Sequence, residues 1–265
     1  MKTVILCGGK GTRIRGVNDD APKPMIEIGP YPVLWHIMRG YAAYGHKDFV
    51  LCLGHKSWII KQFFLNYQAQ LADFTVDFKN AGKVVSHSRD PDIDWTITLA
   101  ETGQDTMTGG RVKRIQKYIG DDEDFFLTYG DGVSDIDIDA LLAFHRKHGR
   151  IVTVSGVRPP GRFGELETSA EGAVTEFNEK PQATGGRISG GFFVCNRKIF
   201  DYLPAEDSLV LEQEPLRRLA QDGQLMMYAH DGFWQCMDTP RDHQFLNELW
   251  TSGTAPWTAT KVNRQ

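Results

Sequence analysis

The sequence predicts an α/β fold with a Rossmann-like, mostly parallel mixed sheet and helices on both faces. Short apolar runs typical of buried strands alternate with segments whose apolar residues follow helical spacing. The first run, Thr3 to Leu6, leads directly into Gly8 and Gly9, as at the end of a strand that enters a tight turn. A chain of 265 residues with 41% hydrophobic residues is also long enough to bury a sizeable core.

The segment after the first loop carries the start and stop signals of a helix. Residues 25–28 form a short predicted strand, and Pro32 occupies a position where a helix can begin. The helix is expected over 33–44, and Gly45 provides its stop. The apolar run 49–53 that follows is a further predicted strand.

Ser57 is the predicted N-cap of the next helix, in which Ile59, Ile60, Phe63 and Phe64 follow helical spacing. The other elements expected in this half are strands at 74–78, 95–99 and 125–128, a polar surface excursion at 80–94, and helices at 112–118 and 138–148, the last stopped by Gly149. Because βαβ units place parallel strands side by side, this order predicts that ligands bind at the carboxyl ends of the strands.

Strands outnumber helices from Ile151 onward. We expect strands at 151–157, 164–167, 174–177, 191–195 and 225–230, and helices at 198–203, 215–221 and 241–250. We interpret 151–240 as a continuation of the sheet begun in 1–150, and 241–265 as a C-terminal helix and tail. The whole chain, 1–265, is therefore predicted to be a single domain, and its aromatic stretch 250–257 could either cover the core or form an interface.

Composition argues against several classes of protein. The net charge is −4, and no basic stripe with interleaved aromatic residues indicates nucleic acid binding. Cys7, Cys52, Cys195 and Cys236 lie mostly within apolar runs without a C-x-x-C pair, so we expect free thiols in a reducing compartment. No signal-peptide core is found, and no apolar run approaches the ~20 residues of a membrane span. We expect a cytoplasmic protein that does not bind membranes.

The turn after the first strand has the composition of an anion-binding site. Gly8, Gly9 and Gly11 let backbone N–H groups converge on phosphate oxygens without Cβ atoms in the way. Arg13 adds a fork that can bind two pyrophosphate oxygens, and Lys23 adds a charge that can reach a different phosphate. Neither the dinucleotide fingerprint nor the P-loop pattern fits. A plain strand-to-helix turn would also explain one or two of the glycines.

Two aspartates are candidates for a functional site. Asp131 lies between Gly130 and Gly132 at the end of a predicted strand, and Asp238 precedes a Thr-Pro pair. Each also has a structural interpretation, Asp131 as a turn former and Asp238 as a helix cap. The residues alone leave both interpretations open.

The remaining polar candidates are less specific. Lys180, held in extended backbone before a proline, is from its spacing alone a solvated surface lysine. Gly109 and Gly110 are expected to expose backbone groups near a helix N-terminus, and Arg111 adds donors there, although an ordinary loop before a helix would look the same.

Several motifs, in order along the chain, resemble the signature of the sugar-1-phosphate nucleotidyltransferases, and in particular their glucose-1-phosphate cytidylyltransferase branch. The motifs are Leu6–Arg13, Pro22–Met25, Leu34–Met38, Met107–Arg111, Thr128–Gly132, Pro160–Gly164, Glu179–Pro181 and Gly232–Thr239. The resemblance runs from Met1 to about Trp257. It implies transfer of a cytidylyl group from CTP to α-D-glucose 1-phosphate, with Mg²⁺ as cofactor and a homo-oligomeric assembly.

The resemblance also implies a role for each candidate residue. Arg13, Lys23 and Asp131 would be catalytic, and Asp131 and Asp238 would bind Mg²⁺. Nucleotide-binding residues would be Leu6, Gly8, Gly9, Lys10, Gly11, Thr12, Arg13, Lys23, Thr106, Gly109, Gly110, Arg111 and Gly130, in the nucleotide-binding half 1–150. Sugar-phosphate-binding residues would be Arg162, Gly164, Glu179, Lys180, Ser189 and Gly190, in the half 151–240.

One departure from the family pattern leaves the acceptor open. Ser189 replaces the asparagine that the family's sugar-binding turn normally carries, so the hydroxyl pattern that it reads can differ. A different sugar or polyol phosphate, or a different pyrimidine nucleotide, is therefore an alternative. A non-catalytic nucleotide-binding subunit is another, but such a protein has no reason to retain all the charged candidates together.

Overall fold

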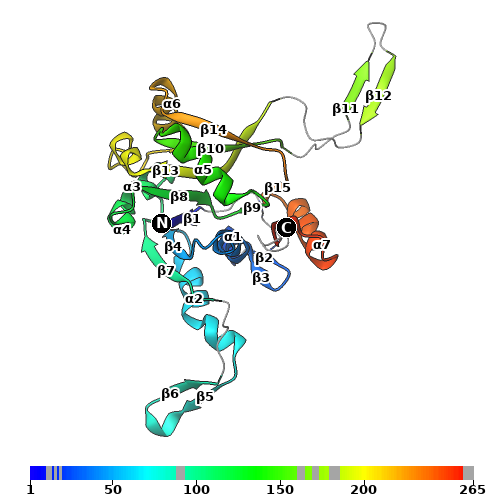
Figure 1. Ribbon diagram of the computed structural model, residues 1–265. Helices are drawn as coiled ribbons and strands as arrows, with labels where there is room; N and C mark the ends of the chain where they lie inside the picture. The colour runs from blue at the N-terminus through cyan, green and yellow to red at the C-terminus, as the bar shows by residue number, and fades with distance from the viewer. Residues whose placement is uncertain are drawn as a thin grey trace.

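The computed structural model describes residues 1–9, 14, 17, 20–87, 93–159, 165–168, 173–178 and 186–258. A seven-stranded sheet with the order β14-β10-β13-β8-β1-β4-β7 forms its centre (Figure 1). Its strands are β1 (Thr3–Leu6), β4 (Asp48–Leu53), β7 (Thr96–Glu101), β8 (Asp124–Tyr129), β10 (Val152–Val157), β13 (Ile188–Asn196) and β14 (Leu225–His230). Strands from the second half of the chain thus extend the sheet begun by the first half.

The strand directions follow the predicted mixed pattern. β1 pairs in parallel with β4 and β8, β4 with β7, and β10 with β14. β13 is antiparallel to both β8 and β10. The predicted α/β fold with a mostly parallel mixed sheet is confirmed.

Helices cover both faces of the sheet because successive strand residues point to opposite sides. The helices are α1 (Val33–Ala42), α2 (Ser57–Leu71), α3 (Thr108–Arg114), α4 (Gln116–Ile119), α5 (Ile138–His148), α6 (Glu214–Gln221) and α7 (Pro240–Thr251). In β1, Ile5 packs in one buried cluster with residues of α1, α5 and α7, whereas Val4 and Leu6 pack in a second with residues of α3, α4 and α6. The two clusters hold β1 at the centre of the molecule (Figure 1).

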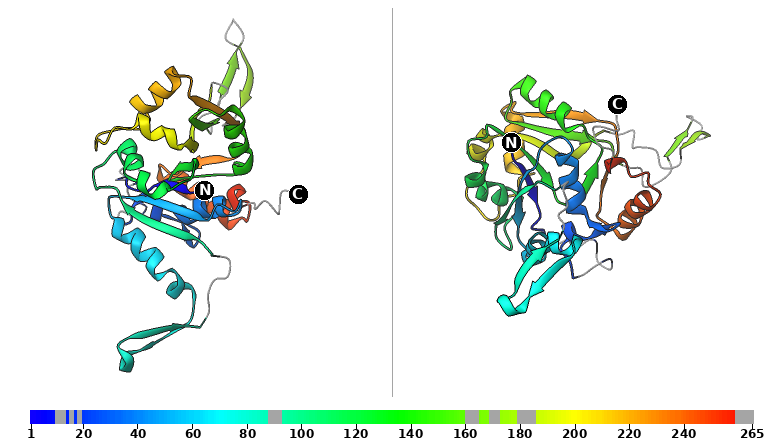
Figure 2. Two further views of the ribbon diagram at one scale, coloured as in Figure 1. Left: turned by 60° about the vertical axis from the view of Figure 1, so that its left-hand side comes forward. Right: turned by 60° about the horizontal axis from the view of Figure 1, so that its bottom comes forward.

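Two hairpins stand away from the sheet in Figures 1 and 2. One joins β5 (Phe74–Asp77) to β6 (Lys83–Ser86) through the 3₁₀ helix η3 (Phe78–Asn80), and the other joins β11 (Glu165–Thr168) to β12 (Val174–Asn178). The surface excursion expected at 80–94 contains the exposed strand β6, which was not predicted. The hairpin turns at Ala81 and Gly82, which both adopt positive φ.

Local backbone geometry changes three other predictions. Ser57 is the first residue of α2 rather than its cap, because Lys56 adopts φ +53° and the Ser57 amide closes a turn to the Gly54 carbonyl. The helix predicted at 112–118 starts earlier and is divided at Ile115 into α3 and α4. The segment predicted as the helix 198–203 is the 3₁₀ helix η4 (Arg197–Tyr202).

The described part of the C-terminal tail covers the core. Trp257, in the 3₁₀ helix η5 (Pro256–Thr258), is 6% exposed and stacks on Phe233 with ring centroids 5.6 Å apart. Trp250 contacts the His36 ring edge-on. Of the two roles considered for this stretch, the structure therefore shows that it covers the core.

Cys7, Cys52 and Cys195 are buried free thiols, and Cys236 is a half-buried one. Free thiols were predicted at all four positions, so that expectation is confirmed. Within the described ranges, no helix is both long enough and apolar enough to cross a membrane.

His36 connects the tail to α1 as a neutral imidazole. It is 3% exposed, its Nε2 lies 2.9 Å from the Ile28 carbonyl, and its Nδ1 accepts a hydrogen bond from the Trp257 indole at 3.3 Å. Burial lowers the pKa of His36 to about 4, against a smaller opposing effect of the Ile28 carbonyl. A proton on Nδ1 would break the bond from Trp257.

We predict that His36 makes the protein less stable in acid. The pKa of His36 is lower in the folded protein than in the unfolded chain. Its contribution to the free energy of unfolding is therefore complete above pH 6.5 and is lost as the pH falls toward 4. Lowering the pH from 7 to 5 should reduce the free energy of unfolding by about 2 kcal/mol through protonation of this residue. Urea unfolding at several pH values should show that the free energy of unfolding falls less steeply with decreasing pH in His36→Gln than in the wild type. Glutamine keeps a donor and an acceptor but does not titrate. The exposed His87→Gln is the control, and an unchanged slope in His36→Gln would contradict the assignment.

Candidate active site

A cleft with a volume of about 520 Å³ opens at the carboxyl ends of β1, β7 and β8. It is lined by Leu6, Cys7, Gly8, Gly9, Lys23, Pro24, Gln104, Asp105, Thr106, Met107, Thr108, Arg111, Tyr129, Gly130, Asp131 and Asp238. Many of the residues predicted to bind nucleotide or metal are thus brought to one place from distant parts of the chain. This edge of a parallel sheet is where ligands bind in such folds.

A larger cavity, of about 720 Å³, lies near the opposite ends of the strands. Its lining includes Met1, Asp124, His145 and Arg150, and contains none of the predicted site residues. The larger volume favours this cavity as the active site, whereas the chemistry of the lining residues favours the cleft. We assign the active site to the smaller cleft, because the candidate charges converge there at the carboxyl ends of the strands.

A short β-ladder brings Asp131 and Asp238 together. Asp131 lies between β8 and β9 (Gly132–Ser134), and Asp238 follows β15 (Trp234–Cys236). β9 and β15 are antiparallel, with Gly132 opposite Cys236. Beyond the ladder, the Met237 amide donates to the Asp131 carbonyl at 2.8 Å. The backbone register therefore fixes the separation of the two carboxylates.

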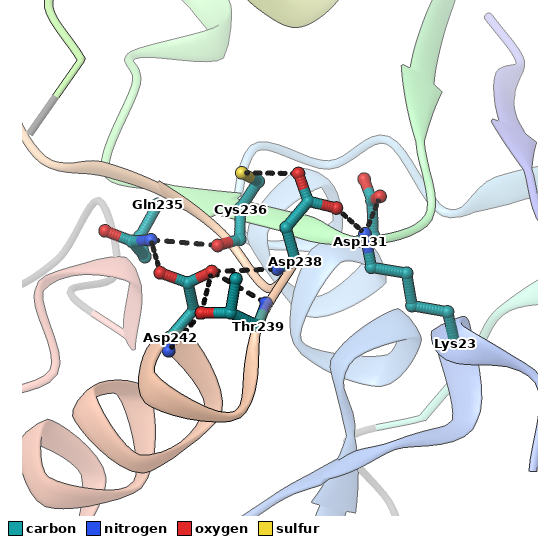
Figure 3. Close-up of polar contacts among 7 residues, drawn as sticks. All are labelled: Lys23, Asp131, Gln235, Cys236, Asp238, Thr239 and Asp242. Atoms are coloured by element: carbon teal, nitrogen blue, oxygen red, sulfur yellow. Dashed lines mark hydrogen bonds and ion pairs between the residues drawn. The ribbon is translucent and has the colours of Figure 1, made fainter. Parts of the chain in front are cut away.

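Lys23 lies between these carboxylates (Figure 3). Its Nζ is 2.6 Å from Asp131 Oδ2 and also forms an ion pair with Asp238 Oδ1. The lysine belongs to the 3₁₀ helix η2 (Lys23–Met25), and its side chain is 11% exposed. Burial acts to lower the pKa of Lys23, but the two carboxylates outweigh that effect and raise the pKa above its ordinary value. The ammonium is therefore charged, and the two carboxylates hold it in place.

The carboxylate of Asp238 is not the cap of α7. Thr239 is the N-cap, and it forms a reciprocal capping box with Asp242. Asp238 instead directs Oδ1 to Lys23, and its Oδ2 accepts a weak hydrogen bond from the Cys236 thiol at 3.6 Å. The capping interpretation of Asp238 is therefore wrong, and its carboxylate faces the cleft.

The donor set at Asp131 and Asp238 fits a magnesium ion that is completed by its substrate. Within the described ranges, no group of three or more His, Cys, Asp or Glu side chains converges as a metal site. Mg²⁺ commonly uses one or two carboxylates and takes its remaining ligands from phosphates and water. Two adjacent carboxylates in a cleft large enough for a nucleotide match that pattern.

Arg111 has a different environment from the one expected. Its side chain is buried, and its guanidinium donates to the carbonyls of Leu53, Gly103 and Gly8 at 2.8, 2.7 and 3.1 Å and to Thr102 Oγ1 at 2.8 Å. These bonds connect the turn after β1 to the ends of β4 and β7. Arg111 lines the cleft and supports its walls with these donors, and its assignment to the nucleotide stays a prediction.

The two glycines before Arg111 also differ from expectation. The amides of Gly109 and Gly110 donate to the Leu209 carbonyl at 2.9 and 3.2 Å, and neither glycine lines the cleft. A Cβ at Gly109 would lie 2.7 Å from Leu209 Cγ, and one at Gly110 would lie 2.6 Å from the Glu206 carbonyl oxygen. Their exposure at the helix start was wrongly predicted, because the segment after η4 packs against them.

A family model described as nucleotidyl transferase matches residues 2–243. The chain belongs to the nucleotidyl transferase family. It is 49% identical to the glucose-1-phosphate cytidylyltransferase of Salmonella typhi over 258 residues, which cover 97% of this chain and 98% of that one. It is 44% identical to the probable glucose-1-phosphate cytidylyltransferase of Bacillus subtilis (strain 168) over 257 residues, covering 97% and 99%.

Solved structures show the same fold at lower identity. HddC from Yersinia pseudotuberculosis superimposes with a TM-score of 0.68 and 23% identity, over 94% of this chain and 99% of that one. A putative glucose-1-phosphate thymidylyltransferase from Bacillus anthracis gives a TM-score of 0.66 and 17% identity, over 94% and 95%. At these identities the similarity extends to the fold of the family and no further.

Several predicted site residues lie outside the described residues. They are Lys10, Gly11, Thr12, Arg13, Arg162, Gly164, Glu179 and Lys180. Of the sugar-site candidates, Ser189 is exposed on β13, and the Gly190 carbonyl accepts a hydrogen bond from the Trp234 indole at 2.8 Å. Neither lines the cleft. The assignments of these residues stay predictions.

The structure adds cleft residues that sequence reasoning missed. Tyr129 precedes Gly130, and its hydroxyl donates to Glu212, which also accepts from Thr108 Oγ1 at 2.6 Å. Gly191, at φ +77°, leaves room for the Tyr129 ring, because a Cβ there would lie 2.4 Å from it. No spacing signal marks Glu212. Tyr129 could have been found, since it lies within the Thr-Tyr-Gly-Asp-Gly motif.

We predict that Arg111→Lys destabilises the protein, because a lysine cannot supply the planar set of donors that these carbonyls require. The loss should be about 2 kcal/mol or more, as expected when buried acceptors are left unpaired. Chemical denaturation would measure it, with the exposed Arg217→Lys as the matched control. A variant as stable as the wild type, but with weakened nucleotide binding, would show that Arg111 acts on the ligand instead.

Proposed function

We propose that this protein transfers a cytidylyl group from CTP to α-D-glucose 1-phosphate, giving CDP-glucose and pyrophosphate. The observation that carries the proposal is 49% identity over nearly the full length of a glucose-1-phosphate cytidylyltransferase. The cleft supports it independently, since it places a charged lysine and two carboxylates where a triphosphate can bind. The cytoplasmic location expected from the cysteine pattern stays a prediction.

The reaction needs no nucleophile from the protein. A sugar phosphate is already anionic at neutral pH, so its oxygen can attack the α-phosphorus in line with the departing pyrophosphate. The protein contributes position and charge. Arg13 is assigned to the leaving pyrophosphate, Lys23 to the α-phosphate, and Lys180, with Arg162, to the sugar phosphate. Mg²⁺ held by Asp131 and Asp238 would neutralise charge on the phosphates.

This assignment requires Lys23 to exchange partners. Its Nζ is held between Asp131 and Asp238, and in the proposed mechanism these two carboxylates bind Mg²⁺ while Lys23 contacts the α-phosphate. The arriving phosphate gives the ammonium a new anionic partner, and the carboxylates then become available. The ion pairs with the ammonium offset the charge of two adjacent carboxylates.

The homo-oligomer implied by the resemblance stays a prediction, and one surface supports it. The projecting β5–β6 hairpin exposes apolar side chains, with Phe78 86% exposed at its tip. The others are Phe74, Val76, Val84 and Val85. Clustered exposed apolar residues of this kind are typical of surfaces that bind another protein. A second copy of the chain is the partner that the resemblance implies.

We predict that pyrophosphate release will be fastest with CTP and α-D-glucose 1-phosphate in the presence of Mg²⁺. The assay should compare CTP, UTP, GTP and dTTP, each with a panel of sugar 1-phosphates. Asp131→Asn, which removes charge but keeps size, should lose turnover and keep the wild-type melting temperature. Equal use of UTP or dTTP would contradict the nucleotide assignment. A faster reaction with another sugar 1-phosphate would contradict the acceptor assignment, the alternative that Ser189 leaves open.

We predict that Lys23→Met separates metal affinity from turnover. Removing the ammonium frees both carboxylates, so Mn²⁺ should bind the nucleotide-free variant on the order of tenfold more tightly than the wild type. Its kcat should fall by roughly 10² to 10³, because charge on the α-phosphate is no longer offset. Electron paramagnetic resonance of free Mn²⁺ would measure the affinity. Lys2→Met, which removes a lysine paired with Asp48 at the other end of β1, is the control. Unchanged Mn²⁺ affinity in Lys23→Met would show that the ammonium does not compete with the metal.

A further inference from the structure

Asp242 lies in the first turn of α7 and is the centre of a hydrogen-bond network around Asp238 (Figure 3). Its Oδ2 accepts three hydrogen bonds, from the Asp238 amide at 3.1 Å, the Thr239 amide at 2.8 Å and the Thr239 hydroxyl at 2.9 Å. Its Oδ1 accepts a fourth, from Gln235 Nε2 at 3.0 Å. Both carboxylate oxygens of Asp242 therefore accept hydrogen bonds.

Two of these bonds go beyond what helix capping needs. A capping box requires bonds between the N-cap residue and the third helical residue, here Thr239 and Asp242. The bond to the Asp238 amide fixes the backbone of the proposed metal ligand itself. The bond from Gln235 ties the helix to the strand that precedes Asp238.

Gln235 makes this second bond from a rigid position. It is 6% exposed, it pairs with Val133 in the β9–β15 ladder, and its Nε2 also donates to the Cys236 carbonyl at 2.9 Å. Asp238 therefore lies in a short connection whose two ends, β15 and α7, are joined through Asp242. On the other side, the Met237 amide is held by the Asp131 carbonyl. Little freedom is left for the Asp238 backbone.

We propose that Asp242, held by Gln235, is a positioning residue that sets the orientation of Asp238 for metal binding. The proposal rests on the assignment of Asp238 as a metal ligand. Asp242 touches neither substrate nor metal in this role, because its oxygens are directed to Asp238, Thr239 and Gln235. Residues that orient a metal ligand in this way commonly contribute 10- to 100-fold to metal affinity or activity.

The test compares Asp242→Ala with Asp137→Ala. Asp137 caps α5 by accepting a hydrogen bond from the Ala140 amide at 2.9 Å, and it does not line the cleft. Both variants lose capping hydrogen bonds at a helix N-terminus, so both should lose about 2–4 °C in melting temperature. Mn²⁺ affinity, measured by electron paramagnetic resonance with CTP present and no sugar phosphate, should fall about tenfold or more in Asp242→Ala alone. The KM for glucose 1-phosphate should stay unchanged.

Two further variants complete the design. Asp242→Asn, which keeps the side-chain shape but turns an amide toward Gln235, carries the test if Asp242→Ala does not fold, with the same direction and a smaller loss. Wild-type Mn²⁺ affinity in a folded Asp242 variant would overturn the proposal, because the residue would then only cap α7. Asp238→Asn separates this result from a failure of the metal assignment. If Asp238→Asn also binds Mn²⁺ like the wild type, the metal site is wrong and this proposal falls with it.

Discussion

The antiparallel pairing of β9 with β15 is the constraint on which the candidate site depends. Asp131 and Asp238 are far apart in the sequence, and the proposed Mg²⁺ site uses both. The ladder places Cys236 opposite Gly132, and the Met237 amide then reaches the Asp131 carbonyl. Because strand register changes only in whole residues, a slip of one residue would turn alternate side chains to the other face and separate the two carboxylates.

The fold was largely predictable, because each half of the sheet repeats a pattern that depends on local spacing. Apolar runs of strand length and glycine stops located the central strands and α5, whose predicted bounds agree with the structure. β9 and β15 were missed because each has three residues and is defined by its partner rather than by its own sequence. Ser57 was assigned wrongly because Lys56 adopts a positive φ, and a lysine in the sequence does not indicate that conformation.

The candidate site was predictable in its residues more than in their contacts. Lys23, Asp131 and Asp238 were named from the motifs, and the structure brings them together. Arg111, Gly109 and Gly110 were also named, but their polar groups bond to carbonyls within the protein. A motif marks residues that the site requires, and it does not separate those that face the ligand from those that support its walls. That distinction depends on burial, which long-range packing decides.

The proposed exchange of partners at Lys23 depends on contacts that hold the cleft in place. The walls are fixed by buried hydrogen bonds from Arg111, and the Asp238 backbone is held through Asp242. In the proposed mechanism Lys23 is the group that changes partners, because its charge lies at the end of a flexible four-carbon side chain.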